Sequence, residues 1–199
     1  MPSLLLAAFP PELAGLAAAP PAGWVARTAG IGAIAAAVTT ARLVAELRPD
    51  RVLFVGTCGA YDERLAIGAH VSAAEAVAVS SEELDGRAYR PELERTCWPA
   101  TWALPFPAFP VAVPPAITVG VESALRLAAR APVEHLELTG VFAACHAAGV
   151  PVAGALAVAN RVGPAAHAEW RANHARVSLA LLEALERAGV FGDQWSVGQ

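Results

Sequence analysis

The chain has 199 residues, of which 56% are hydrophobic and 16% charged, with a formal net charge of −4 at pH 7. This length supports a sizeable core, and so apolar a composition excludes an intrinsically disordered chain. The acidic balance argues against a nucleic-acid or acidic-membrane partner. Lysine is absent from the sequence, which excludes chemistry that depends on a P-loop or Schiff-base lysine.

Cysteine usage and hydropathy both favour a reduced, soluble, cytoplasmic protein. The cysteines are far apart and form no CxxC pair, so we expect neither a zinc ribbon nor a disulfide framework (Cys58, Cys97 and Cys145). The mean hydropathy of +0.46 reflects the many alanines. The start of the chain lacks the basic segment of a signal peptide, and prolines interrupt the uncharged stretch after Arg95.

The first half of the chain alternates short apolar runs with helical patterns. The run Arg51–Val55 is continuous and apolar, which is typical of a strand buried on both faces. Apolar residues recur at helical spacing in Ala33–Leu47, and Gly30-Ile31-Gly32 predicts a tight turn before that helix. The predicted elements are strands at 3–8, 24–28, 51–55 and 67–79, a helical turn at 10–13, a helix at 33–47, and a small-residue turn at 56–60.

The second half begins with a segment that predicts little regular structure. We expect a solvated loop at 80–95, which holds most of the local charge, and a loop rich in proline and tryptophan at 96–115. The aromatic side chains from Trp98 to Phe109 are expected to be exposed and to serve an interface. The remaining predicted elements are strands at 116–121 and 150–159, helices at 123–130, 137–148 and 165–189, and a tail at 191–199. In the last helix five apolar residues are expected to face the core, namely Val177, Leu179, Leu181, Leu182 and Leu185.

Strands alternate with helices along the chain, which favours an α/β fold of three layers (α/β/α) with helices on both faces of a mixed central sheet. The sequence shows no internal repeat and no linker, so residues 1–199 are expected to form one domain. In such folds ligands bind at the carboxyl ends of the strands, and Gly56-Thr57-Cys58-Gly59 follows a predicted strand. The GxGxxG fingerprint is absent, which disfavours a nicotinamide cofactor.

Three polar residues stand in apolar surroundings next to predicted element ends, namely Glu12, Glu137 and Asn160. Each has a structural explanation when taken alone, because acids suit the first turn of a helix and asparagine suits a left-handed turn. Brought together at the edge of a sheet, however, a carboxylate and an amide could hold a sugar and a base.

The order of these segments resembles the purine nucleoside phosphorylase superfamily, particularly its hydrolytic nucleosidases, along nearly the whole chain. The segments that carry the resemblance are Ala8-Phe-Pro-Pro-Glu12-Leu13, Thr28-Ala-Gly-Ile-Gly32, Val55-Gly-Thr-Cys-Gly-Ala60, Ile67-Gly-Ala-His-Val71, Glu137 with Cys145-His146, Gly149-Val-Pro151 and Asn160. The ending Asn160-Arg-Val-Gly-Pro164, followed by His167-Ala-Glu-Trp170 and Asn173, is similar to that of the futalosine hydrolases of the alternative menaquinone pathway. The sequence departs from the family at Pro10 and Pro11, where polar residues are frequent, and at Leu136, where many relatives have methionine.

The resemblance implies a role for each matching residue. Glu12 matches the acid that orients and deprotonates the attacking water, Glu137 the glutamate that binds the ribose hydroxyls, and Asn160 the side chain facing N7 and the 6-substituent of the purine. The other matches are Gly56, Thr57 and Cys58 at the ribose and water site, Thr118 and Val119 on the segment that lines the base, and Leu136 beside the ribose glutamate.

These residue types suit hydrolysis of an N-glycosidic bond, because cleavage builds positive charge on the ribose and negative charge on the departing base. The amide of Asn160 can donate to a 6-oxo group and accept from N7–H, whereas a 6-amino group would face it donor against donor. The sequence therefore favours release of hypoxanthine, as from futalosine or inosine. Phe54 stands where uridine-phosphorylase-like relatives carry an arginine, and Glu12 would repel phosphate, so hydrolysis is favoured over phosphorolysis.

Two alternatives stay open at this point. One is a related purine nucleosidase or phosphorylase that acts on inosine or methylthioadenosine, and the other is a nucleoside-binding homologue without turnover. We expect no cofactor and no metal, because the histidines show no metal-ligand spacing. The expected partners are a small-molecule nucleoside and further copies of the chain, since the family is usually dimeric or higher. His167 is expected either at the surface or against the ribose or the substrate's additional group.

Overall fold

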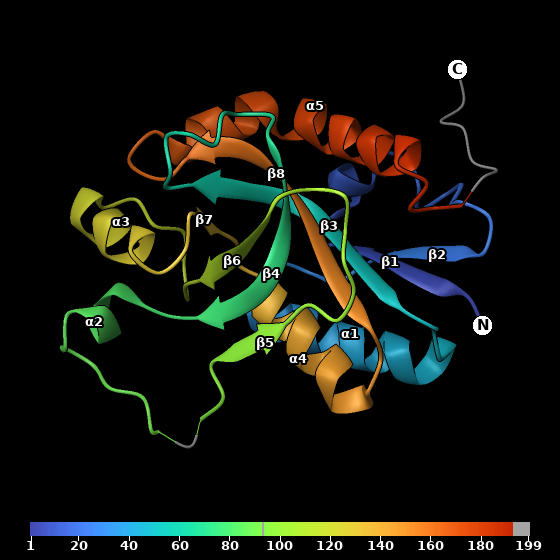
Figure 1. Cartoon of the computed structure of the whole chain (residues 1–199), viewed down its shortest axis with the longest axis horizontal. Helices are drawn as coiled ribbons and strands as arrows, with labels where there is room; N and C mark the ends of the chain where they lie inside the picture. Colours follow the sequence, from blue (N-terminus) through green and yellow to red (C-terminus); the bar gives the residue numbers. More distant parts are fainter. Residues whose placement is uncertain (93, 193–199) are drawn as a thin grey trace.

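In the computed structural model, which describes residues 1–92 and 94–192, an eight-stranded mixed sheet lies between helices on its two faces (Figure 1). The predicted three-layer α/β class is confirmed. The elements in chain order are β1 (Ser3–Ala7), η1 (Pro10–Leu13), β2 (Trp24–Thr28), α1 (Ala33–Leu47), β3 (Val52–Ala60), β4 (His70–Ala78), α2 (Ser81–Leu84), β5 (Cys97–Pro99), β6 (Ala108–Val113), α3 (Val121–Ala128), β7 (Val133–Glu134), α4 (Leu138–Ala148), β8 (Val152–Arg161) and α5 (Ala166–Arg187).

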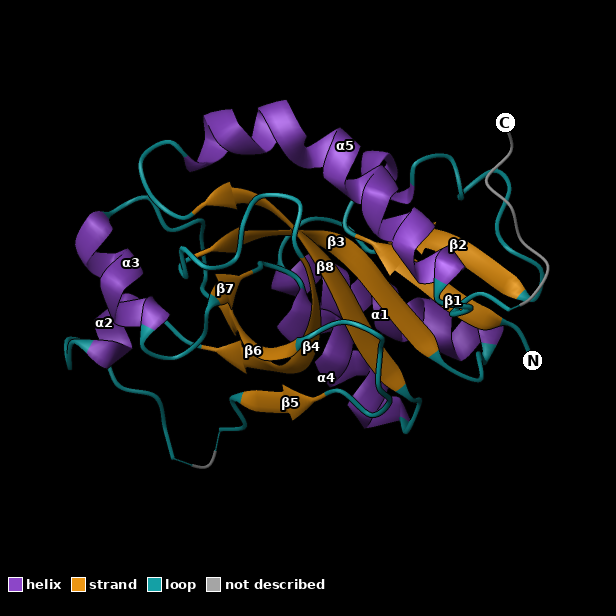
Figure 2. Ribbon diagram, turned by 45° about the horizontal axis from the view of Figure 1, so that its top comes forward, coloured by secondary structure: helices purple, strands orange, loops and turns teal. Residues whose placement is uncertain are grey.

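The sheet combines a parallel part with a ring of strands. β1 pairs in parallel with β2 and with the first half of β3, while β8 pairs in parallel with β3 on its other side. β8 also pairs with β4, β4 with β6, β6 with β7, and β7 with the end of β3. These five strands therefore close on themselves, and Figure 2 shows β1 and β2 extending from the ring.

The two faces of the sheet bury separate clusters of side chains. Along β1, Leu4 and Leu6 belong to the cluster on the side of α1 and α4, whereas Leu5 belongs to the cluster on the side of α5. This alternation follows from the two-residue period of a strand. Both faces are covered, so the first halves of the central strands β3 and β8 are continuously apolar, as the run at 51–55 predicted.

Helices α1 and α4 pack directly against each other at a position that admits no side chain. A Cβ atom on Gly140 of α4 would lie 2.0 Å from the backbone oxygen of Ala33 at the start of α1. Only glycine allows this approach. The start of α1 is thereby brought next to the start of α4, which matters for the site described below.

The small residues at 56–60 are part of a strand, so the predicted turn is wrong. β3 continues to Ala60, because its backbone pairs with β8 and then with β7. The residues are small for reasons of packing. A Cβ on Gly56 would lie 3.0 Å from the Phe54 ring, and one on Gly59 would lie 2.8 Å from Val162.

The predicted loop at 96–115 and the predicted strand at 116–121 are also wrong. β5 and β6 form within the proline-rich segment because both pair with β4, and their prolines occupy an edge strand (Pro99) and an irregular point of the ladder (Pro110). Residues 116–120 form no strand, because Thr118 donates its N–H to the carboxylate of Glu134 instead of to a neighbouring strand. β7, of two residues, was too short to be predicted.

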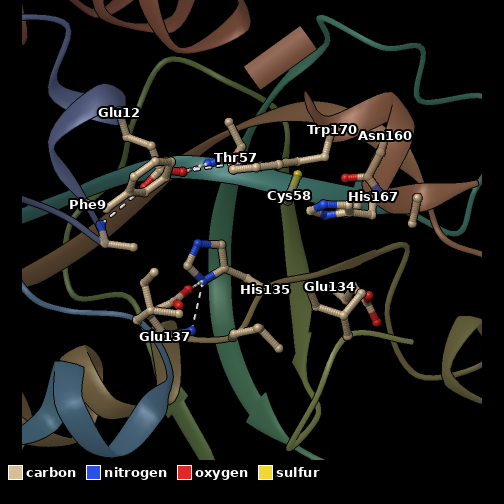
Figure 3. A pocket seen from close by; sticks show the side chains of 16 residues that line it. Phe9, Glu12, Thr57, Cys58, Glu134, His135, Glu137, Asn160, His167 and Trp170 are labelled. Carbon is tan, nitrogen blue, oxygen red and sulfur yellow. Dashed lines mark hydrogen bonds and ion pairs between the residues drawn. The ribbon is translucent and has the colours of Figure 1, made fainter. Parts of the chain in front are cut away.

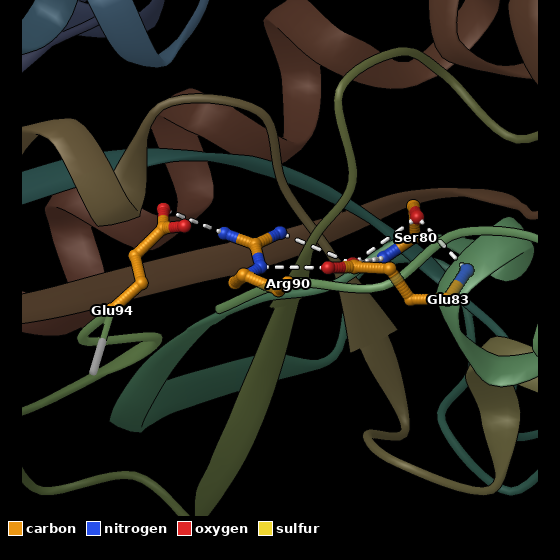
Figure 4. A network of polar contacts seen from close by, with 4 residues as sticks. All are labelled: Ser80, Glu83, Arg90 and Glu94. Carbon is orange, nitrogen blue, oxygen red and sulfur yellow. Dashed lines mark hydrogen bonds and ion pairs between the residues drawn. The ribbon is translucent and has the colours of Figure 1, made fainter. Parts of the chain in front are cut away.

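The charged segment after β4 is more ordered than the predicted loop. Ser80 and Glu83 form a capping box that starts the short helix α2. Arg90 then holds the excursion together, donating to Glu83 at 2.7 Å and to Glu94 at 3.2 Å (Figure 4). The segment is ordered by local hydrogen bonds between charged groups. The prediction of a loop relied on the absence of an apolar pattern and therefore missed this order.

The burial of side chains agrees with the predictions for two cysteines and differs from them for several apolar residues. Cys58 and Cys145 are buried and free, as predicted. The large aromatic residues between 98 and 109 are partly buried and pack against the two main clusters, which contradicts their predicted exposure (Trp98, Trp102, Phe106 and Phe109). Leu179 is 39% exposed because it lies about 200° around α5 from Val177, outside the buried stripe.

The predicted tail at 191–199 is described only in part. The part of the predicted tail beyond residue 192 lies outside the described residues. In the described part of the chain, no helix combines the length and apolar character needed to cross a membrane.

Candidate active site

A cavity of about 290 Å³ lies at the carboxyl ends of the parallel strands β1, β3 and β8 (Figure 3). Such a crevice is where ligands bind in open α/β sheets. Segments η1 and β7 and the first turns of α5 complete its wall. The lining residues are Ala8, Phe9, Glu12, Ile31, Thr57, Cys58, Gly59, Ile117, Glu134, His135, Leu136, Glu137, Asn160, Ala166, His167 and Trp170.

Glu12 is buried, and hydrogen bonds from two strands hold its carboxylate. Oε1 accepts from the backbone N–H and the hydroxyl of Thr57, each at 2.8 Å. Oε2 accepts from the backbone N–H of Ala8 at 3.2 Å. The proline at the start of η1 suits the first helical turn, which returns Glu12 toward the end of β1.

The environment of Glu12 brings its titration close to neutral pH. Burial raises the pKa of Glu12 to about 7, because desolvation of the charged form outweighs the hydrogen bonds from Thr57, and the charge of Glu137 adds to the rise. A carboxyl group with such a pKa is largely ionised just above neutral pH and remains basic enough to take a proton. It therefore has the properties of a general base.

Trp170 of α5 reaches the same carboxylate through Thr57. Its indole N–H donates to Thr57 Oγ1 at 3.0 Å, which directs the hydroxyl proton of Thr57 toward Glu12. The Trp170 ring also stacks on His174, with centroids 4.3 Å apart, and lies 5.8 Å from the ring of Phe9. The cavity wall near Glu12 is therefore aromatic.

Glu137 caps the start of α4 and is buried. Its Oε1 accepts from the backbone N–H of Gly32 at 2.8 Å, and Oε2 lies 3.2 Å from Nδ1 of His135. The close packing of α1 on Gly140 brings Gly32 within reach of this carboxylate. The position of Glu137 thus depends on how the two helices pack.

His135 stands between the two carboxylates. Its Nδ1 lies 3.1 Å from the backbone N of Glu137, which donates to it, and 3.2 Å from Oε2 of the same residue. Burial lowers the pKa of His135 and favours its neutral form, although the charge of Glu137 opposes the shift. A Cβ on Gly56 would lie 3.1 Å from Nε2 and 3.5 Å from Oε1 of Glu12, so glycine leaves room for both groups.

Asn160 lies near the end of β8 at the other side of the cavity. One N–H of its amide donates to the carbonyl of Arg161 at 2.9 Å, and the amide has a second N–H and a carbonyl oxygen with which to bind a ligand. The pairing of β3 with β8 shifts register between Cys58 and Gly59, opposite Asn160. Such an irregularity re-aims a side chain.

The structure brings most of the predicted site residues to this cavity. Glu12, Thr57, Cys58, Leu136, Glu137 and Asn160 line it. Gly56, Thr118 and Val119 are absent from its lining: Gly56 lies beside His135, Thr118 is buried against Glu134, and Val119 is 58% exposed. Ile117, from the same segment, lines the cavity instead of the last two.

Sequence reasoning gave no role to several lining residues, among them Phe9, Ile31, Glu134, His135 and Trp170. One available signal was the polar pair Glu134-His135 directly before Leu136-Glu137 in an apolar region. His167, for which two locations were open, lines the cavity.

The reactive groups of the cavity are carboxylates. Within the described residues, no three His, Cys, Asp or Glu side chains gather in a way that could hold a metal ion. Burial raises the pKa of the Cys58 thiol, which keeps it protonated and poorly nucleophilic. Glu12, Glu134 and Glu137 are left as the acids available to a ligand.

Comparisons with solved structures show the same fold at low sequence identity. The 5'-methylthioadenosine/S-adenosylhomocysteine nucleosidase from Helicobacter pylori, with butyl-thio-DADMe-Immucillin-A, has a TM-score of 0.81 and 15% identity over 94% of this chain and 97% of that chain. Futalosine hydrolase of Helicobacter pylori has a TM-score of 0.79 and 15% identity over 94% and 98%. The nucleosidase from Colwellia psychrerythraea, in complex with adenine, has a TM-score of 0.77 and 16% identity over 93% of each chain.

Sequence comparisons place the chain in a family. No curated protein sequence matches it. The model of the phosphorylase superfamily matches residues 24–136, which is more than half of the chain and includes β3 and the Glu134–Leu136 segment of the cavity wall. The chain therefore belongs to the phosphorylase superfamily, a family of nucleosidases and phosphorylases that cleave the N-glycosidic bonds of nucleosides.

Proposed function

We propose that this protein is a hydrolase that cleaves the N-glycosidic bond of a 6-oxopurine nucleoside, with futalosine as the first candidate and hypoxanthine as the released base. The observation that carries the proposal is the presence of Glu12, Glu137 and Asn160 in the wall of one cavity. The fold shared with the Helicobacter pylori futalosine hydrolase is consistent with it.

Glu137 is suited to the ribose. Its carboxylate is fixed by Gly32 and faces His135, and a carboxylate readily accepts hydrogen bonds from two adjacent hydroxyls. As the bond to the base breaks, positive charge develops on the ribose. A fixed negative charge nearby stabilises that state.

Glu12 is suited to the water. A water molecule donates one proton to the Glu12 carboxylate while its oxygen forms a bond to C1' of the ribose. The C1'–N9 bond breaks, its electron pair leaves with the base, and the base anion takes a proton from solvent at N7. Thr57 and Ala8 hold the carboxylate in place during this transfer, since both donate to it.

Asn160 is suited to a 6-oxopurine. Its N–H can donate to O6 and its oxygen can accept from N7–H, so the amide stabilises the departing base. Against adenine the amide N–H would face the 6-amino group. An unmatched buried polar group costs about 1–3 kcal/mol, which is enough for a clear preference.

The charges of the cavity favour water over phosphate as the nucleophile. Among the described residues, the lining contains three glutamates and no arginine. This chain has Phe54 at the position where uridine-phosphorylase-like relatives were expected to carry an arginine. A phosphate dianion would meet like charges there.

A second copy of the chain is proposed to cover the mouth of the cavity. Ile34 on α1 is 84% exposed, and Val38 one turn further along α1 and Ile31 just before the helix are exposed too, as are Ile117 and Leu125. Ile31 and Ile117 also line the cavity, so this apolar surface is continuous with the site. Sedimentation of wild type and Ile34→Glu tests the association, and a wild-type monomer at micromolar concentration would contradict it.

The proposed reaction is tested by measuring free base after incubation with futalosine, inosine and methylthioadenosine, with and without phosphate. We expect hypoxanthine release from futalosine at the same rate in both conditions. Strict dependence on phosphate would instead indicate a phosphorylase. Preferred release of adenine would indicate a methylthioadenosine nucleosidase, and binding without release would indicate a nucleoside-binding homologue.

A further inference from the structure

A second hollow, of about 610 Å³, lies at the amino ends of the parallel strands, away from the cavity described above. It is lined by Ser3 at the start of β1, Trp24 at the start of β2 and Arg51 directly before β3. Residues 102–105, between β5 and β6, and residues 188–192, after α5, complete its wall. The nucleoside cavity lies at the carboxyl ends of β1 and β3, so the two sites are separate.

The two hollows differ in charge. Among the described residues that line the second hollow, only Arg51 is charged, and it is a cation. The described lining of the nucleoside cavity has three glutamates and no arginine. Because a cleft lined by one sign of charge attracts ligands of the other sign, an anion suits the second hollow.

Two indole rings hold the guanidinium of Arg51 between them. Its Cζ atom lies 5.1 Å from the ring centroid of Trp24 and 5.0 Å from that of Trp102. The ring faces attract the cation and restrict the plane of the guanidinium. Trp24 also meets the ring of Phe191 edge to face, with centroids 5.4 Å apart. Arg51 is therefore oriented before any ligand binds, which lowers the entropy that binding costs.

Arg51 keeps hydrogen-bond donors for a ligand. Its Nε–H donates to Oγ of Ser3 at 3.2 Å, and one N–H of Nη2 donates to the carbonyl of Val190 at 3.5 Å. A guanidinium carries five N–H groups, so both terminal nitrogens have N–H groups left. These match the two oxygens of a carboxylate.

The protein supplies no such carboxylate itself. Within residues 1–92 and 94–192, no acidic side chain forms an ion pair with Arg51, and the adjacent Asp50 pairs with the amino group of Met1 at 3.1 Å. The cation is half-buried and is held by rings and neutral oxygens. A bound carboxylate would therefore add its first charged partner among these residues.

Most of the remaining wall is apolar, with Leu104, Pro105 and Val190 beside the two indole rings. An inorganic anion would satisfy Arg51 and leave this wall in water. A ligand that fills the hollow thus combines an anionic head with an apolar body, since small-molecule sites pair a few polar groups with apolar walls.

We propose that the second hollow binds a small organic carboxylate, which accepts hydrogen bonds from Arg51 while its apolar body contacts residues 102–105. The site involves none of the residues assigned to nucleoside hydrolysis. It therefore stands or falls independently of the proposed function.

Calorimetry on the wild-type protein tests the chemical class of the ligand. Benzoate is compared with benzamide, a neutral molecule of nearly the same shape, and with inorganic phosphate. We expect benzoate to bind about 10- to 150-fold more tightly than benzamide, which converts the about 1.5–3 kcal/mol of hydrogen bonds to a charged group. Equal binding of the two, or no binding of benzoate, would overturn the proposal. Tighter binding of phosphate than of benzoate would also overturn it, because the apolar wall would then have no role.

The indole N–H signals in NMR spectra locate the bound benzoate. Signals are assigned with single Trp→Phe variants. Those of Trp24 and Trp102 should shift on addition of benzoate, while that of Trp170 in the nucleoside cavity should stay in place. A shift of Trp170 without the other two would place benzoate in the nucleoside cavity and contradict the proposal.

The variant Arg51→Gln tests the residue itself. It removes the charge, so benzoate should bind about 10- to 150-fold more weakly than to wild type. Arg48→Gln, an exposed arginine at the end of α1, is the matched control and should leave the affinity unchanged. Unchanged affinity in a folded R51Q would overturn the proposal. If R51Q does not fold, the comparison of benzoate with benzamide and the indole shifts of the wild-type protein decide.

Discussion

The two sides of the cavity are held by different parts of the protein. Near Glu12 and Glu137 the carboxylates accept backbone N–H groups from distant segments, namely Thr57 for the first and Gly32 for the second. Near Asn160 and Glu134 the partners include side chains and adjacent residues, such as the hydroxyl of Tyr61. Backbone donors from distant segments therefore anchor both carboxylates of the first side, whereas the hydroxyl of Tyr61 and the backbone of Thr118 and Arg161 hold the second.

The strongest test of this difference is Glu12→Gln. The variant loses the proposed base, so kcat should fall about 10²- to 10⁴-fold while the nucleoside still binds. Base release and calorimetric binding are measured together, and Glu46→Gln, an exposed acid on α1, is the control. Full activity of E12Q would remove Glu12 from the mechanism.

The base side should respond by changing preference instead of losing activity. In Asn160→Asp a protonated carboxyl can donate to N7, which suits adenine. The ratio of kcat/KM for adenosine to that for inosine should rise about 5- to 150-fold, equivalent to about 1–3 kcal/mol. If both substrates lose activity equally, Asn160 supports the structure without reading the base.

The pH dependence of stability gives an independent view of the catalytic side. The pKa of Glu12 is raised from 4.5 to about 7, so its contribution to stability is complete below pH 4.5 and is lost as the pH rises through 7. E12Q lacks this titration. The free energy of unfolding of E12Q minus that of wild type should therefore increase by about 3 kcal/mol from about pH 4 to about pH 8. Urea unfolding at both pH values measures this, and a constant difference would contradict it.

The smallest expected effect comes from the edge of the catalytic side. Trp170→Phe keeps an aromatic ring but removes the donor to Thr57, so kcat should fall about fivefold for a lost hydrogen bond of about 1 kcal/mol. The acid limb of the pH–rate profile should also move to higher pH, because Thr57 is less firmly held as a donor to Glu12. Trp98→Phe on β5 is the control, and a profile like wild type in W170F would contradict this role.

The same division explains what could be predicted from the sequence. Glu12 and Glu137 follow local signals, a proline-started turn and a helix start, and both line the cavity. Glu134 and His135 belong to a strand end that exists only because β7 pairs with β3 and β6, contacts far apart in the sequence. The segment 96–115 was misassigned for the same reason, since pairing with β4 overrides the proline content.

The glycine contact between α1 and α4 links binding to local motion. Because Gly140 lets α1 approach α4, the N–H of Gly32 is given to Glu137, a residue proposed to hold the ribose. Opening of the seam between the helices would release that carboxylate, so a bound nucleoside should hold the seam closed. Amide hydrogen exchange at the start of α1 would then slow when the cavity fills, and the packing of two helices would report on the occupancy of the site.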